Sequence, residues 1–175
     1  MTIQAQYLGM PLDISALDAE NLDYFRHCAA HDFHLQACSG CGLLRYPPTT
    51  ACPWCANPGA RWTRVEGRGA VHSYTEVHHA IQPAFRAHVP YLVLLVDLDT
   101  QNGKPSAEEA LRVVGNLVRP DGVLAPPELV RTVGIGTRVR MVFSDVAPSL
   151  ALPQWTIDET AQQPAKPWRY PQETA

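Results

Sequence analysis

The chain has 175 residues, of which 46% are hydrophobic and 18% charged, with 16 prolines and a formal net charge of −3. This balance predicts one domain of ordinary size plus an appendage, made of short strands and many turns, and excludes a long helical bundle. A pI of about 6.1 and only two lysines argue against a broad nucleic-acid-binding face, because neutralising phosphates takes clustered Lys and Arg.

The chain shows no segment suited to a membrane. Its longest apolar run, Tyr91 to Val96, has the length of a strand and not of a membrane span. The N-terminus, MTIQAQYLGM, lacks the basic and apolar blocks of a signal peptide. We therefore expect no membrane partner and a cytoplasmic location.

Residues 1–36 are expected to contain an extended lead-in and a helical segment. Apolar residues recur at close to helical spacing and predict one or two helices across roughly 15–32. His27 and His31 have the i, i+4 spacing of a helical metal site, but no carboxylate motif accompanies them. A solvated or partner-facing helix surface is the favoured interpretation.

Residues 37–63 contain two Cys-x-x-Cys pairs in the stretch CSGCGLLRYPPTTACPWC. Each pair can form a turn whose thiolates point at one centre, and two facing turns supply the four sulfurs of a tetrahedral zinc site. Two disulfides, four reduced thiols, iron and a redox-active dithiol are the alternatives, and a reducing compartment favours metal. Zinc held by four thiolates has no open position, so its role would be structural. The predicted ligands are Cys38, Cys41, Cys52 and Cys55.

Residues 64–158 have the pattern of a mainly β domain. Alternating or continuous apolar segments predict five strands, at about 69–78, 91–99, 111–118, 137–143 and 150–157. Few helices are needed between them, which favours a small closed five-stranded barrel of the OB-fold type over a parallel sheet. In the first strand, alternation places Val71, Ser73 and Thr75 on one face. The proline-rich tail, 159–175, is expected to be loose or to lie along a partner surface.

No catalytic motif emerges from the sequence. It has no Gly-x-Ser-x-Gly elbow, no phosphate-binding loop and no dinucleotide fingerprint. His72 or His78 could act as a base with Asp97 or Asp99, but a histidine on an alternating strand is more often a surface or partly buried residue. We expect no catalytic residue in this chain, with a stand-alone enzyme that uses these histidines as a further alternative.

The order of these features resembles a known bacterial and archaeal family. The segments QACSGCGLLRYPPTTACPWC, WTRVEGRGAVHSYTEVHH, VPYLVLLVDLD, VVGNLV and GIGTRVRMVF follow one another as in proteins that join a rubredoxin-like zinc ribbon to an OB-fold, long classed as a domain of unknown function. The resemblance covers about residues 16–157. It implies zinc at the four cysteines named above.

The resemblance also implies a function. Members of this family are non-catalytic accessory subunits that form hetero-oligomers with thiolases, thiolase-like acyltransferases or aldolases, hydroxymethylglutaryl-CoA synthases or enoyl-CoA hydratase-like enzymes, and help to handle acyl-CoA. A single-stranded nucleic-acid-binding OB-fold is the alternative, which the acidic pI disfavours. The insertion at 100–111 and the long tail depart from the family pattern, and either could change the partner.

Arginine and aromatic side chains are the candidates for contact with acyl-CoA or with a partner. Arginine binds phosphate through a planar fork, and aromatic residues anchor protein interfaces. Pairing of the arginines with nearby Glu66 and Glu76, and packing of the apolar side chains between ribbon and barrel, are the alternatives. The candidates are Arg45, Trp54, Arg64, Arg68, Phe85, Arg86 and Tyr91.

Overall fold

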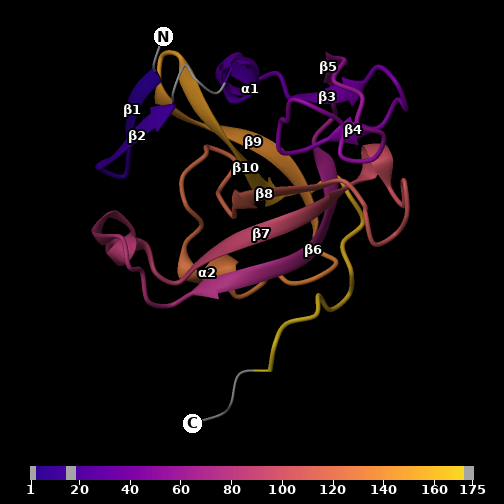
Figure 1. Cartoon of the computed structure of the whole chain (residues 1–175). Helices are drawn as coiled ribbons and strands as arrows, with labels where there is room; N and C mark the ends of the chain where they lie inside the picture. The colour runs from indigo at the N-terminus through magenta and orange to yellow at the C-terminus, as the bar shows by residue number, and fades with distance from the viewer. Residues whose placement is uncertain (1–2, 15–18, 172–175) are drawn as a thin grey trace.

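The computed structural model describes residues 3–14 and 19–171, which form three antiparallel sheets with few helices (Figure 1). The strands are β1 (Ile3–Tyr7), β2 (Met10–Ile14), β3 (His34–Cys38), β4 (Leu44–Arg45), β5 (Ala60–Arg64), β6 (Arg68–Val77), β7 (Tyr91–Leu98), β8 (Arg112–Asn116), β9 (Arg138–Ala147) and β10 (Leu150–Ile157). The helices are α1 (Ala19–Ala29) and α2 (Pro127–Val130), with the 3-10 turns η1 (Pro83–His88) and η2 (Asp99–Gln101).

The main sheet has the strand order β10-β9-β6-β7-β8, and it confirms the predicted five-stranded OB-fold. The prediction of a closed barrel is wrong, because this hydrogen-bonded sheet is open between β8 and β10. Among the described residues, backbone pairing of these two edges is found beyond β8, where Leu117 bridges Trp155 and the Val118 amide donates to the Trp155 carbonyl at 2.8 Å. Gly115 on β8 lies against the indole of Trp155 on β10. At this position the two strands are in contact through packing and not through backbone pairing.

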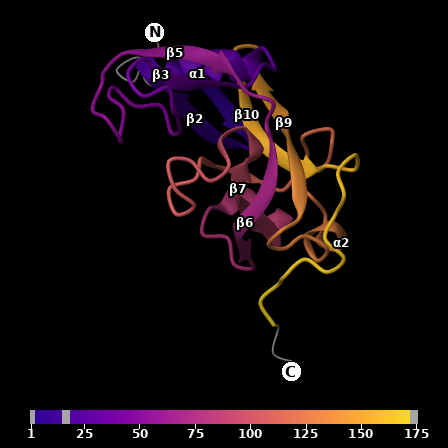
Figure 2. The same cartoon turned by 90° about the vertical axis from the view of Figure 1, so that its right-hand side faces the viewer.

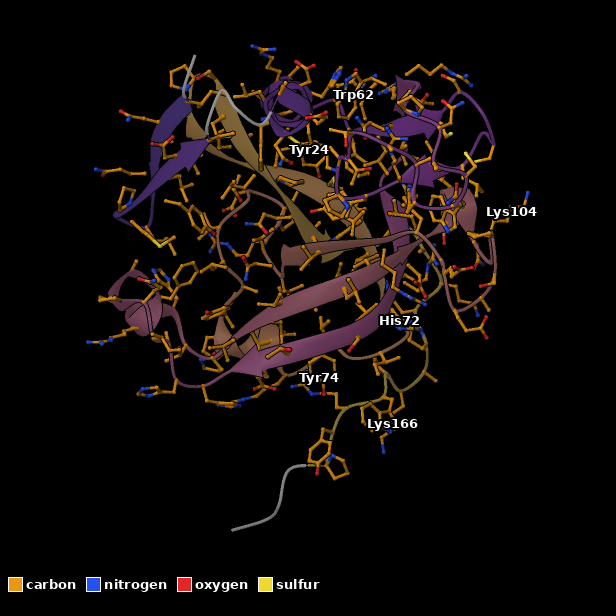
Figure 3. The ribbon with its side chains drawn as sticks, viewed as in Figure 1. Tyr24, Trp62, His72, Tyr74, Lys104 and Lys166 are labelled. Carbon is orange, nitrogen blue, oxygen red and sulfur yellow. The ribbon has the colours of Figure 1, made fainter. Side chains whose placement is uncertain are left out.

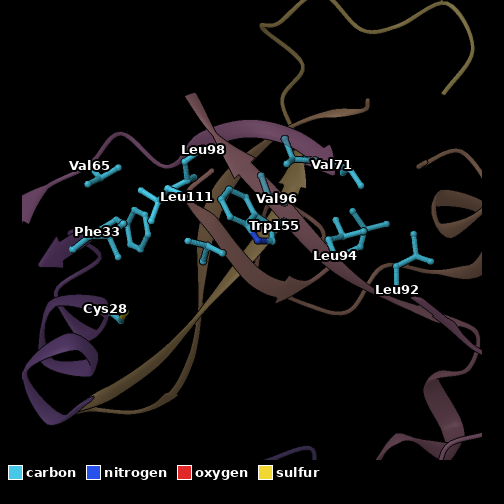
Figure 4. Packing of buried hydrophobic residues seen from close by; sticks show 14 of the residues in the cluster. Cys28, Phe33, Val65, Val71, Leu92, Leu94, Val96, Leu98, Leu111 and Trp155 are labelled. Atoms are coloured by element: carbon cyan, nitrogen blue, oxygen red, sulfur yellow. The ribbon is translucent and has the colours of Figure 1, made fainter. Parts of the chain in front are cut away.

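The core of the barrel gathers around Trp155 (Figure 4). Every second residue of β7, from Leu92 to Leu98, is buried, which is the period of a strand with one covered face. The same cluster continues to Phe33 and Val65, and then to Leu35 and Leu44 of the three-stranded sheet β4-β3-β5. The ribbon and the barrel therefore share one hydrophobic core.

Strand β6 departs from the alternation that its sequence predicts. Its pairing with β7 shifts register between Val71 and Ser73, which marks a β-bulge or a similar irregularity. Val71 is buried, whereas Ser73 and Thr75 are exposed, so the three residues do not share one face. A one-residue shift exchanges the faces of a strand, and simple alternation cannot show where such a shift falls.

The N-terminal lead-in is a hairpin, which the sequence did not indicate. β1 and β2 pair through a turn at Leu8 and Gly9, both of which have positive φ. A primed hairpin turn favours Gly, Asn or Asp at both central positions, so the leucine hides the signal. Helix α1 is shorter than the predicted 15–32, and residues 15–18 of that prediction lie outside the described residues.

The tail packs on the chain's own barrel at the end opposite the ribbon (Figures 1 and 2). Trp168 forms a two-bond bridge with Ile135, at 2.9 and 3.1 Å. The described part of the tail is therefore ordered by contacts within the chain itself. Along 3–14 and 19–171, no helix has the length and apolarity to span a membrane.

Candidate metal centre and its surroundings

The four cysteines lie on two turns of the same design. Cys38 ends β3, and the Gly42 amide closes its turn by donating to the Cys38 carbonyl at 3.0 Å. In the second turn the Ala56 amide donates to the Cys52 carbonyl at 2.9 Å. Gly42 and Ala56 hold equivalent positions, and both have positive φ, 77° and 58°. The sequence thus builds the same loop twice, with glycine at the left-handed position of only one copy.

The two turns face each other and bring the four sulfurs to one point. All four Sγ atoms lie within 4.8 Å of one another, with Cys38 to Cys55 at 3.5 Å and Cys41 to Cys52 at 3.6 Å. Zinc–sulfur bonds of about 2.3 Å place the corners of a tetrahedron about 3.8 Å apart, so the cluster fits a zinc ion. The cysteines are free thiols and not disulfides.

The electrostatics of the cluster favour a bound cation. The Cys41 amide, opposed by burial and helped by the Gly40 amide, lowers the pKa of the Cys38 thiol to about 6. At Cys41 the Leu43 amide also lowers the pKa, but burial and the neighbouring sulfurs outweigh it and raise the pKa to about 12. The Cys38 thiol therefore ionises easily whereas Cys41 resists, so four thiolates held together at this point require a positive ion.

The insertion at 100–111, taken from sequence as a departure from the family, holds the ribbon in place. Gln101 is buried on η2, and its amide pairs with the Leu44 backbone on β4. The Leu44 amide donates to Gln101 Oε1 at 2.7 Å, and Gln101 Nε2 donates to the Leu44 carbonyl at 3.0 Å. This contact extends the ribbon's hydrogen bonding into the barrel domain.

Arg45 supports the ribbon from inside. Its guanidinium is buried and donates to Gln36 Oε1 at 2.8 Å and to the Thr49 carbonyl at 2.9 Å. The Thr49 amide also donates to Gln36 Oε1, at 2.9 Å. Arg45 therefore ties β3 to the loop between the two cysteine pairs, and its side chain does not face solvent.

The other six candidate contact residues do not gather at one place. Trp54 is half-buried in the second cysteine turn, and Arg64 at the end of β5 is largely exposed and pairs with Asp32 at 2.8 Å. Arg68 pairs with Glu66 at 2.9 Å and with Asp158. The remaining three lie near η1, at the far end of β6 and β7 from the ribbon, where Phe85 packs on the Tyr91 ring at 5.2 Å. They are Phe85, Arg86 and Tyr91.

The histidines considered from sequence have separate partners. His27 stacks on His34 at 4.1 Å, while His31 meets Asp145 at 2.7 Å. His72 lies 3.1 Å from Asp97, which also accepts from Arg112 at 2.7 Å. Among the described residues, the four cysteines are the one group of three or more ligand side chains arranged to hold a metal.

A family model and a solved structure show which family this chain resembles. A family model, the C-terminal OB-fold domain of ChsH2, matches residues 62–144. A solved structure described as the Ltp2-ChsH2(DUF35) aldolase is 30% identical, with a TM-score of 0.63, and the match covers 82% of this chain and 98% of that one. The chain belongs to the DUF35 family.

Two further proteins were found to be similar to this DUF35 chain. A probable enoyl-CoA hydratase alpha subunit from Thermomonospora curvata is 34% identical over 140 residues, which is 79% of this chain. The chain spans only 37% of that protein's length. A DUF35 protein of unknown function from Sulfolobus solfataricus is 13% identical with a TM-score of 0.49, and the match covers 78% of this chain and 83% of that one.

Proposed function

We propose that this chain is a non-catalytic accessory subunit of an enzyme that transforms acyl-CoA, with a partner from the thiolase superfamily or a related hydratase. The observation that carries the proposal is its match to a chain of the Ltp2-ChsH2(DUF35) aldolase, 98% of which it covers, together with the match of residues 62–144 to the OB-fold domain of ChsH2. The hydratase subunit, whose substrate is an enoyl-CoA by name, supports the link to CoA thioesters. In this role the chain would help to bind or channel acyl-CoA.

We propose that the cysteine cluster holds zinc with a structural role. Cys38, Cys41, Cys52 and Cys55 would be the ligands, and the spacing of their sulfurs supports this. When bound, the ion neutralises the thiolates and links the two turns. Four sulfurs complete its coordination, so a substrate has no position on it. The chain's own contribution is to position the turns, through Arg45, Gln36 and Gln101.

The arrangement of charges agrees better with this role than with nucleic-acid binding. Several arginines are already paired with carboxylates, including Arg64 with Asp32, Arg112 with Asp97 and Arg138 with Asp99. A strand of phosphates needs a continuous positive groove instead. Exposed Arg86 stays a candidate for contact with a CoA phosphate or with the partner.

The test is to identify the partner and measure what the chain adds to it. The tagged full chain is expressed in its own host, captured, washed with salt and analysed by mass spectrometry for a stoichiometric enzyme subunit. That enzyme is then assayed on acyl-CoA thioesters with and without the chain. We expect one thiolase-like or hydratase-like subunit, with more activity or tighter substrate binding in the complex.

Two outcomes would contradict the proposal. If the wild-type chain retains no enzyme subunit and runs as a monomer, the accessory role is wrong. If the isolated chain turns over an acyl-CoA, and His72→Ala abolishes the turnover, the chain is an enzyme itself. His72 is surface-exposed, so this substitution should leave the fold intact.

A further inference from the structure

The tail is fastened to the barrel through Arg169. Its guanidinium donates to the Val130 carbonyl at 2.7 Å and to the Val133 carbonyl, and it pairs with Glu76. It also lies over the Tyr74 ring, 5.2 Å from the centroid. The Arg169 side chain therefore contacts carbonyl, carboxylate and aromatic groups at once, and together they form a specific binding site for its guanidinium.

The backbone on both sides of Arg169 is held as well. Trp168 exchanges two hydrogen bonds with Ile135, and the Tyr170 amide donates to the Tyr74 hydroxyl at 2.9 Å. Gly134 leaves room for the Trp168 carbonyl, since a Cβ at that position would collide with it. These contacts order the tail without using the rings of Trp168 or Tyr170.

The fastened tail leaves two large aromatic rings in solvent. The exposed fractions are 55% for Trp168 and 75% for Tyr170, and Ile135 beside them is 37% exposed. With Tyr74 of β6 these side chains border a cavity of about 410 Å³, named here the tail pocket. In Figure 3, Tyr74 and the tail residue Lys166 both lie in the lower part of the view, and Trp62 of the ribbon lies at the top. Rigidly held, exposed Trp and Tyr side chains are typical anchors of protein interfaces.

The apolar surface does not end at the tail pocket. A second cavity of about 290 Å³ shares Ser73, Tyr74 and Thr75 with it and extends across the sheet to the apolar residues Val93, Leu95 and Val114. Val114 on β8 is itself 45% exposed. Apolar side chains gathered in neighbouring hollows mark an interaction site more often than scattered ones do.

The charges in the tail pocket select the kind of occupant. His78 is the basic group among its described lining residues, and it lies 3.3 Å from Glu76. Arg169 next to it is already engaged by Glu76 and two carbonyls. Among the described residues, the pocket therefore offers no unpaired cation for the phosphates of CoA, whereas its aromatic and aliphatic side chains suit an uncharged apolar side chain.

We propose that the catalytic partner subunit docks at the tail pocket by inserting an apolar side chain between Trp168, Tyr170 and Ile135. This inference rests on the proposed function, because it names the surface by which the accessory subunit joins its enzyme. Arg169 is a positioning residue in this interface, since it orders the tail and leaves contact to its neighbours.

The test measures affinity of full-length variants for the enzyme subunit identified by capture. Trp168→Ala and Tyr170→Ala should each raise the dissociation constant about tenfold, which is the effect expected when an interface anchor is truncated. Arg169→Ala keeps both rings but releases the tail, and it should weaken binding similarly. Ile81→Ala is the matched control, because Ile81 is an apolar residue with 86% exposure outside the pocket lining. Its affinity should equal that of the wild type.

A second measurement uses the unmodified complex. Oxidative footprinting should show Trp168 and Tyr170 protected when the enzyme subunit is bound. If Trp168 and Tyr170 are oxidised equally in the free and bound chain, and both ring variants bind with wild-type affinity, the tail pocket is not the docking site. The proposed function would still stand. Failure of the wild-type chain to bind any enzyme subunit would overturn both. If light scattering shows a homodimer that Trp168→Ala dissociates, the occupant is a second copy and the inference is wrong.

Discussion

At the residue scale, the two cysteine turns of the ribbon have different residues, glycine and alanine, at the same left-handed backbone position. Gly42 and Ala56 close equivalent turns with positive φ. An L-residue in this region places its Cβ too close to the following carbonyl oxygen, whereas glycine has no such penalty. Since nothing lies within 4 Å of a Cβ built on Gly42, substitution there would report backbone strain without a steric clash.

We predict that Ala56→Gly stabilises the chain by about 1 kcal/mol, and that Gly42→Ala destabilises it by a similar amount. The free energy of unfolding of the metal-loaded full chain, measured in urea, checks both changes. A loss of stability in Ala56→Gly would show that the flexibility added to the unfolded chain exceeds the strain that is relieved.

Asp158 makes the stability of the folded chain depend on pH in the acid range. It is almost fully buried and accepts from the Thr160 amide and hydroxyl and from Arg68. Burial by itself would raise the pKa of Asp158, but the Thr160 and Arg68 contacts outweigh it and hold the pKa below its usual value. Because its pKa is lower in the folded chain, Asp158 contributes stability above its unfolded pKa of about 3.9. This contribution is lost as the pH falls through the folded pKa.

We predict that Asp158→Asn costs about 1–2 kcal/mol at pH 7, a figure kept small because the Arg68 side chain is 35% exposed. Urea unfolding at a series of pH values should show the wild type losing this advantage below about pH 4. Parallel curves for wild type and variant over that range would assign the acid sensitivity to other groups.

At the element scale, η2 and β4 join two parts of the chain that are far apart in sequence. The Gln101 amide faces the Leu44 backbone across 57 residues of sequence, and both residues are buried. A backbone amide and carbonyl that lose such a partner inside the protein are left without water to replace it. The insertion is therefore part of the support for the ribbon.

We predict that Gln101→Ala destabilises the chain by roughly 2–3 kcal/mol, because two buried hydrogen bonds are lost together. It should also speed hydrogen exchange at the Leu44 amide. Asn102→Ala is the control, since Asn102 is the exposed neighbour on the same loop. Equal stability of the two variants would mean that the ribbon is held by packing alone.

At the scale of the whole molecule, the ribbon and the OB-fold behave as one packed body. Leu35 and Leu44 of the ribbon belong to the same buried cluster as Leu94 and Trp155 of the barrel. Loss of order in the ribbon would therefore expose part of the common core. We expect one cooperative unfolding transition for the described chain, and a metal that affects all of it.

We predict that chelation, or Cys38→Ser or Cys52→Ser, lowers the unfolding temperature of the whole chain and abolishes assembly with the partner. The reason is that structural zinc contributes folding free energy directly. Metal content, calorimetry and capture of the enzyme subunit are measured on the same samples. A metal-free variant that folds and assembles but leaves the complex inactive would contradict a structural role for the ion.

The sequence by itself determined the local features of this protein. The spacing of Cys38, Cys41, Cys52 and Cys55 predicts two facing turns, because each turn involves only a few consecutive residues. The five barrel strands were predictable for a similar reason, since burial of one face imposes an apolar period of two. The Leu8-Gly9 turn was not, because Leu8 stands where Gly, Asn or Asp is usual, and the register shift near Val71 was not, because alternation does not show where such a shift falls.

Only the tertiary structure decided which distant residues meet. Arginines that are near one another in sequence separate into a buried support, Arg45, and surface ion pairs such as Arg64 with Asp32. Gln101 reaches the ribbon, and Arg169 draws the tail onto β6, although nothing near either residue in sequence indicates its partner. Such contacts depend on the path of the whole chain, and local propensity and periodicity contain no information about that path.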